Sequence, residues 1–125
     1  MRGFSLIELM VACAIIAILA AIAIPSYAYY LRQSRRSDAE ATLMDIAQRE
    51  QQYLLDQRVY ATNTTTLSTT IPVDVSSYYT VTINAPAVTP PVFTVTATPI
   101  AGSVQGSDYT LTLDNTGVRS PAAAW

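Results

Sequence analysis

The residues with the clearest potential for chemistry stand at the start of the chain, where Gly3 and Phe4 precede an acidic residue, Glu8. A free α-amino group is compact and charged at neutral pH. Cleavage after Gly3 would therefore place a cation on Phe4, about one helical turn before the Glu8 carboxylate. The two charges could pair within one chain or between adjacent chains, so a free amine on Phe4 would neutralise the acid.

The segment that carries these residues is almost entirely apolar. Of the 21 residues from Phe4 to Ile24, only Ser5 and Glu8 are plainly polar. As a helix this segment would cover roughly 30 Å, the thickness of the hydrocarbon core of a bilayer. The sequence therefore predicts a membrane-inserting helix. A carboxylate one turn inside it is costly unless a cation neutralises it, it reaches the headgroups, or it takes up a proton.

Other chemistry is poorly represented. The chain has no His, and its one Cys, Cys13, lies inside the apolar segment, so it offers neither a nucleophile–base pair nor an intramolecular disulfide. Asp74, Asp108 and Asp114 lack the dense spacing of a Ca²⁺ site and are interpreted as solvated loop acids. The net charge of −2 provides no basic platform for nucleic acid. We expect a protein that is not an enzyme and has no catalytic residue, metal or cofactor.

Behind the apolar segment, Pro25 lacks a backbone donor and predicts a kink or a local loosening of the helix. Tyrosines follow, at the level where a membrane–water interface would fall. A charged cluster comes next, which either lies in solvent and at the headgroups or pairs with neighbouring chains. The residues of this candidate pairing are Arg32, Arg35, Arg36, Asp38, Glu40 and Asp45.

From Ser37 to Gln57 the apolar residues recur at spacings of three, four and seven, which is typical of an amphipathic helix. Asp45 and Arg49 form an acid–base pair at i, i+4 that supports such a helix. Residues 58–77 are rich in Thr, Ser and Asn and predict a connecting loop. The apolar stripe of the helix consists of Leu43, Ile46, Ala47, Tyr53 and Leu54.

The last third of the chain alternates apolar residues with Thr, which predicts half-buried antiparallel strands. These strands cover residues 79–83, 92–97 and 109–113, and a short edge strand is expected before Pro121. Asp114 to Gly117 has the composition of a turn. The predicted fold class is α+β. A long N-terminal helix, apolar in its first half and amphipathic in its second, packs on a small antiparallel sheet of three or four strands.

The segment Gly3-Phe4-Ser5-Leu6-Ile7-Glu8-Leu9-Met10 resembles the processing site of type IV pilins, and the apolar residues through Pro25 resemble the N-terminal helix of that family. The resemblance is to the PilE-like, type IVa branch. It implies that a prepilin peptidase cuts after Gly3 and that the new N-terminal Phe4 is methylated. It also implies that Glu8 contacts the N-terminus of a neighbouring subunit and that Pro25 is the helix kink.

The same resemblance implies a leader over residues 1–3, a transmembrane and filament-core helix over 4–25, and a globular domain over 26–125 with its sheet in 78–120. The precursor would lie in the inner membrane. The mature chain would then join copies of itself in a helical extracellular filament, with help from inner-membrane assembly machinery. Many pilins close their C-terminal region with a disulfide, so here packing and backbone pairing must hold that end.

Alternatives remain for the function. A pseudopilin of a type II secretion system would share the N-terminal helix. A minor or tip pilin would act as a receptor in adhesion or DNA binding, whereas a main pilus subunit would support adhesion, motility or DNA uptake. A cleavable secretory signal is disfavoured, because the apolar run is long and contains Glu8.

Overall fold

The computed structural model describes Gly3 and residues 5–125, and it divides the chain into two compact units. The N-terminal unit is Met1–Gln33 and the globular unit is Ser34–Trp125. Helix α1 runs over Leu6–Gln57 and contributes to both. The predicted long helix is confirmed over this range.

Helix α1 passes through Pro25 without interruption. Proline has no N–H to donate to the carbonyl four residues earlier, so one helical hydrogen bond is missing at this point. One residue later, the Ser26 hydroxyl donates to the Ile22 carbonyl over 3.0 Å. The first turn of the helix is formed by two hydrogen bonds, in which the N–H groups of Glu8 and Leu9 donate to the Ser5 carbonyl.

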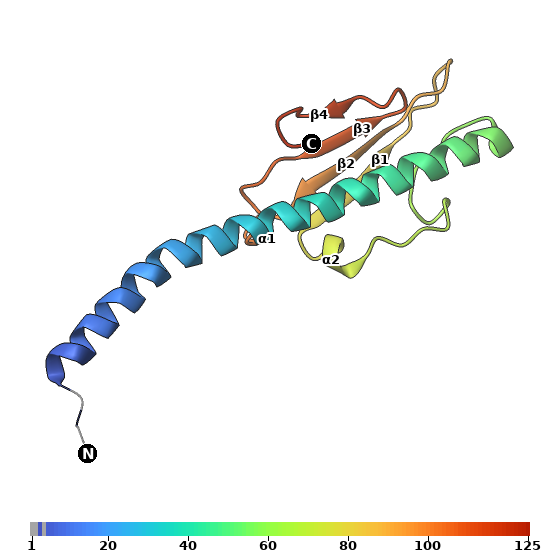
Figure 1. Ribbon diagram of the computed structural model, residues 1–125. Helices are drawn as coiled ribbons and strands as arrows, with labels where there is room; N and C mark the ends of the chain where they lie inside the picture. The colour runs from blue at the N-terminus through green and yellow to red at the C-terminus, as the bar shows by residue number, and fades with distance from the viewer. Residues whose placement is uncertain (1–2, 4) are drawn as a thin grey trace. The chain divides into compact units, whose positions relative to one another are not determined.

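The globular unit contains a four-stranded antiparallel sheet in the order β1-β2-β3-β4, so consecutive strands are neighbours (Figure 1). The strands are β1 (Tyr79–Asn84), β2 (Thr94–Pro99), β3 (Leu111–Asp114) and β4 (Arg119–Ser120). The predicted short strand before Pro121 is therefore present as β4. Strands β2 and β3 each begin two residues later than the alternation predicted.

The loop predicted over residues 58–77 is not wholly irregular, because it contains a short helix, α2 (Val73–Ser76). Pro72 precedes this helix, and its fixed φ favours a helix start immediately after it. Val75 belongs to the core and is 1% exposed. Ala61 and Leu67, earlier in the same segment, are also buried, and apolar residues scattered in this way produce no periodicity from which to predict a helix.

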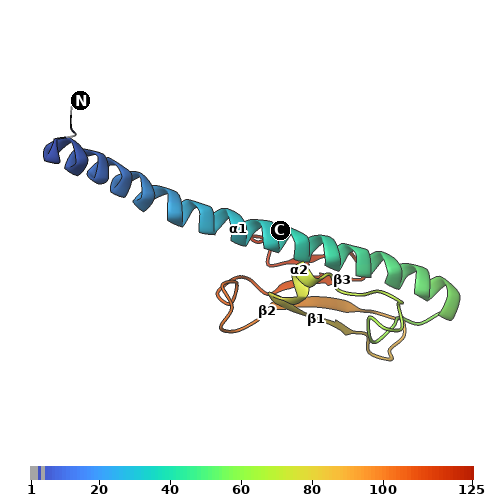
Figure 2. The ribbon, with the colours of Figure 1, turned by 90° about the horizontal axis from the view of Figure 1, so that it is seen from below.

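The core lies between α1 and one face of the sheet, as two layers (Figure 2). Ala39, Leu43 and Ile46 of α1 are completely or almost completely buried, and the burial of Leu43 and Ile46 confirms the beginning of the predicted apolar stripe. The opposing layer comes from alternate residues of the strands, whose intervening threonines face outward. Its buried side chains are Tyr79, Val95, Ala97, Leu111 and Leu113 of the strands and Phe93, which directly precedes β2.

Candidate functional site

The N-terminal unit presents an apolar surface with nothing packed on it among the described residues. Leu6 is 76% exposed, Ile24 is 69% exposed, and the large aliphatic side chains between them are all at least half exposed. This stretch is long and apolar enough to cross a membrane, by length and composition. An apolar surface of this size needs lipid or other protein to cover it.

Glu8 lies in the first turn of α1 within this apolar surface and is exposed. An acidic residue in the first turn is favoured by the partial positive charge of a helix N-terminus. Gly3 lies before the helix, outside regular secondary structure, whereas the predicted methylation site, Phe4, lies outside the described residues. The pairing of a Phe4 amine with Glu8 therefore stays a prediction.

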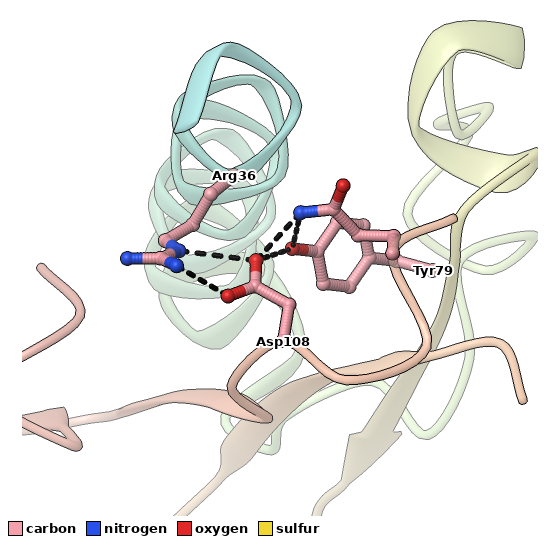
Figure 3. Close-up of polar contacts among 4 residues, drawn as sticks. Arg36, Tyr79 and Asp108 are labelled. Carbon is pink, nitrogen blue, oxygen red and sulfur yellow. Dashed lines mark hydrogen bonds and ion pairs between the residues drawn. The ribbon is translucent and has the colours of Figure 1, made fainter. Parts of the chain in front are cut away.

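The globular unit contains a polar network between α1 and the loop after β2 (Figure 3). The guanidinium of Arg36 forms a two-pronged contact with Asp108, with Nε donating to Oδ2 over 3.1 Å and Nη2 paired with Oδ1. The Tyr79 hydroxyl donates to the same Oδ2 over 2.6 Å. The Gln105 amide nitrogen donates to that oxygen over 2.6 Å and to the Tyr79 hydroxyl over 3.0 Å.

Burial and hydrogen bonding act in opposite directions on the charged pair of this network. The Asp108 side chain is 1% exposed, and its burial works to raise the pKa of the carboxyl. The hydrogen bonds from Arg36 and Tyr79 outweigh burial and hold that pKa below its ordinary value. The pKa of Arg36 is raised by its hydrogen bond to Asp108, and the pKa of Tyr79 is raised by burial and by the same carboxylate. Arg36 and Asp108 thus form the charged pair, and Tyr79 and Gln105 are its neutral hydrogen-bond partners.

The remaining residues of the predicted charged cluster lie in different surroundings. Arg35 lies over the ring of Tyr78, 4.2 Å from its centroid, within the globular unit. Asp38 is exposed, and Glu40 is half-buried, so that burial raises its pKa while the nearby charge of Arg36 lowers it. The pairing of this cluster with neighbouring chains stays a prediction. Arg36 already forms an ion pair with Asp108 of its own chain, so a neighbouring acid would have to share it.

A second buried acid, Glu50, lies on α1 near the end of the helix. Its side chain is completely buried, and Oε2 accepts a hydrogen bond from the Ala61 N–H over 2.8 Å. Its other oxygen, Oε1, has no partner among the described residues. Burial raises the pKa of this carboxyl, and the Ala61 bond partly offsets that effect. Glu50 therefore links the end of α1 to the segment that follows it, through a hydrogen bond to Ala61. Burial of its carboxylate disfavours the charged form.

The three loop acids considered for a metal site have three different environments. The interpretation of Asp108 as a solvated acid is wrong, because the carboxylate is buried against Arg36. Asp114 caps the predicted turn, accepting hydrogen bonds from the N–H groups of Thr116 and Val118, and Gly117 in that turn has φ +83°. Asp74 is exposed. Within Gly3 and residues 5–125, no group of three or more metal-binding side chains comes together.

Sequence reasoning missed the roles of Asp108 and Glu50, although weak signals existed. Asp108 follows a long stretch, Val75 to Ser107, that contains no charged residue, so its charge is isolated in sequence. Glu50 stands four residues after Ile46 and seven after Leu43, which places it on the buried stripe of the helix. An acid on an apolar stripe is a signal for a buried hydrogen bond.

The exposed apolar helix with its single early acid, followed by a helix packed on a small antiparallel sheet, defines the class of the protein as a type IV pilin. Residues 1–24 match the prokaryotic N-terminal methylation motif. Residues 25–112 match the family described as type IV minor pilin ComP, DNA uptake sequence receptor, and the chain belongs to this family. It is a structural class of protein and not an enzymatic one.

Curated relatives agree with this class. The chain is 40% identical over 60 residues to the type IV major pilin protein PilA of Myxococcus xanthus (strain DK1622), which covers 48% of this chain and 27% of PilA. It is 56% identical over 43 residues to prepilin peptidase-dependent protein D of Escherichia coli (strain K12), covering 34% of this chain and 30% of that protein. The matched segments thus span less than a third of either relative. No solved structure matches the chain significantly.

Proposed function

We propose that the protein is a structural subunit of a type IV pilus, anchored in the inner membrane as a prepilin and then assembled into an extracellular filament. The observation that carries this proposal is the apolar face of α1 from Leu6 to Ile24, exposed throughout and bearing one acid in its first turn. Burial of one such Leu or Ile side chain between neighbouring helices stabilises by on the order of 2 kcal/mol. A bundle of copies can supply that burial.

The proposal includes maturation by prepilin peptidase. Cleavage after Gly3 and methylation of Phe4 leave an amine at the head of α1, close in sequence to Glu8. In a bundle of staggered copies, this amine neutralises the Glu8 carboxylate of a neighbour and sets the axial position of each subunit. The match of residues 1–24 to the methylation motif supports this step.

Mass spectrometry of filaments sheared from cells tests the proposal. The expected result is this chain beginning with an N-methylated Phe4. A Gly3→Leu variant should stay uncut and absent from filaments, while a Cys13→Ala variant, altered within the same apolar segment, should mature normally. A filament fraction that lacks the chain while the cells hold mature protein would instead support the pseudopilin alternative.

A DNA receptor is the second candidate function, favoured by the description of the matching family. The charge of the globular unit does not favour it, since this unit holds eight of the nine acidic residues and five of the seven arginines. Arg36 and Arg49 are moreover ion-paired with acids of the same chain. Arg58 and Arg119 are the exposed arginines of this unit.

Fluorescence anisotropy of a labelled DNA duplex, titrated with full chain in detergent, separates the two functions. Phosphate contacts by arginine make binding fall steeply with salt. Binding at physiological salt that is lost in the Arg58→Ala, Arg119→Ala double variant would establish the receptor. We expect no such binding, and filaments that assemble normally from the same double variant.

A further inference from the structure

Strand β1 is an edge of the sheet that lacks the charged residues and proline that commonly protect edges against pairing. The opposite edge, β4, has only two residues, one of them Arg119, and is followed at once by Pro121. Strand β1 lies at the other edge of the sheet (Figure 1). Its six residues, Tyr79–Asn84, include neither proline nor a charged residue. Long edge strands without charge or proline offer their free backbone groups to another strand.

The register shows which backbone groups of β1 face outward. Tyr79 lies opposite Pro99, which has no N–H, and the Ile100 N–H donates to the Tyr78 carbonyl. In an antiparallel ladder, bonded and non-bonded pairs alternate, so Thr80 and Thr82 bond to β2. The N–H and C=O groups of Val81 and Ile83 therefore point away from the sheet.

These four outward groups have no hydrogen-bond partner among the described residues. Helix α2 lies against the start of β1, where Tyr79 is buried, but the residues from Thr80 onward retain exposure. The outer face of the strand consists of Thr80, Thr82 and Asn84, all exposed. The free edge is thus neutral and accessible.

We propose that β1 of one copy pairs with β1 of a second copy, antiparallel and about a two-fold axis at Thr82. In this register, Val81 of each copy lies opposite Ile83 of the other, and all four outward groups of each strand find partners. Thr82 faces its own counterpart as a non-hydrogen-bonded pair, and Thr80 faces Asn84. Threonine pairs in such positions stabilise a sheet.

The charge distribution identifies a second copy as the occupant. From Val75 to Ser107 the chain contains no charged residue, so the whole hairpin of β1 and β2 is neutral. Such an edge gives a strongly acidic or basic partner no counter-charge, whereas a copy of itself brings no like charge to oppose. The threonine rows Thr82–Thr96–Thr112 of the two sheets would continue across the new interface.

Symmetry determines what this contact joins. Successive subunits of a helical filament are related by a screw operation and make heterologous contacts, whereas a two-fold contact is isologous. The β1 pair therefore joins two unassembled subunits or subunits of two different filaments, and it would bundle filaments laterally. Only the bundling consequence rests on the proposed filament function.

Disulfide trapping with the purified full chain in detergent tests the pairing, in a Cys13→Ala background that removes the native thiol. The proposed pair places the two Thr82 Cα atoms about 4.5 Å apart. Each Thr80 lies opposite Asn84 of the other copy, four residues along the strand from the other Thr80, so the two Thr80 positions are about 14 Å apart. Mild oxidation should link copies of the Thr82→Cys variant rapidly, and copies of the Thr80→Cys and Thr98→Cys variants at most slowly.

A charge substitution provides the matched control. Thr82→Lys places like charges opposite each other at the two-fold axis, while Thr98→Lys adds the same charge on the same exposed face of the inner strand β2. Association of Thr82→Lys in sedimentation should fall about fivefold, as expected for like charges directly opposite in an antiparallel pair, and Thr98→Lys should match the parent. Equal cross-linking at all three cysteine positions, or equal association of the two lysine variants, would overturn the proposal.

Discussion

Arg36 and Asp108 are 72 residues apart in sequence and form a two-pronged ion pair, with Nε of the arginine 3.1 Å from Oδ2 of the carboxylate. The side chains are 18% and 1% exposed, respectively. The contact ties α1 to the loop between β2 and β3. A buried charge pair therefore adds to the apolar packing between the helix and the sheet.

Removal of the carboxylate charge should destabilise the globular unit. In an Asp108→Asn variant, Arg36 remains in a largely buried place without a counter-charge, and we expect a loss of about 3 kcal/mol in the free energy of unfolding. The measurement is urea unfolding of the full chain in detergent, followed by fluorescence of Trp125, the single tryptophan. The control is Asp45→Asn, which removes the exposed pair with Arg49 and should cost about 0.5 kcal/mol or less. Equal losses in the two variants would contradict the role of the network.

The same pair should make the protein sensitive to acid. The pKa of Asp108 is lower in the folded protein than its unfolded value of about 3.9, so the folded state favours the ionised carboxyl. Its stabilisation is complete above the unfolded pKa and is lost as the pH falls through the folded pKa. Urea midpoints measured from neutral pH down to about pH 2 should drop more steeply for the parent than for Asp108→Asn. Parallel curves would show that the carboxyl makes no such contribution.

Glu50 should give a pH dependence of the opposite sign. Burial raises its folded pKa above the unfolded value of about 4.3, so its contribution is fully present below that value and is lost as the pH rises through the folded pKa. A Glu50→Gln variant keeps an oxygen for the Ala61 N–H and has no charge to bury. We expect this variant to lack the loss of stability on raising the pH and to equal or exceed the parent at neutral pH. The control is Glu50→Ala, which leaves the Ala61 N–H without this acceptor. This variant should be less stable than Glu50→Gln at every pH.

Glu8 should matter for assembly and not for membrane insertion. A Glu8→Val variant makes the exposed helix more apolar, so fractionation should find it in the membrane in parental amount. Filament yield after shearing should fall strongly, because the proposed contact of Glu8 with the amine of a neighbouring copy cannot form. Normal filaments from Glu8→Val would remove the register role. Cys13→Val changes the same apolar segment without touching a charge and should leave the yield unchanged.

Gly117 should resist replacement although its surroundings are open. An added Cβ would meet no atom within 4 Å, but the residue has φ +83° in the turn between β3 and β4. A Gly117→Ala variant should therefore lose about 1 kcal/mol through backbone strain alone. Thermal unfolding followed by circular dichroism is the measurement. Val118→Ala, at the exposed neighbouring position without a positive φ, is the control.

The sequence alone determined the helix, the strand pattern and the pilin class, because each depends on local periodicity or on contiguous residues. The apolar segment behind Gly3 and the Thr alternation of the strands are readable residue by residue. Only the tertiary structure decided that Asp108 is buried, that Glu50 is a core residue, and that Val81 and Ile83 form a free edge. A partner 72 residues away, as Arg36 is for Asp108, leaves no mark on local spacing. Likewise, the strand that lies at the edge is determined by the order of strands in the sheet, and the local sequence of a strand does not reveal that order.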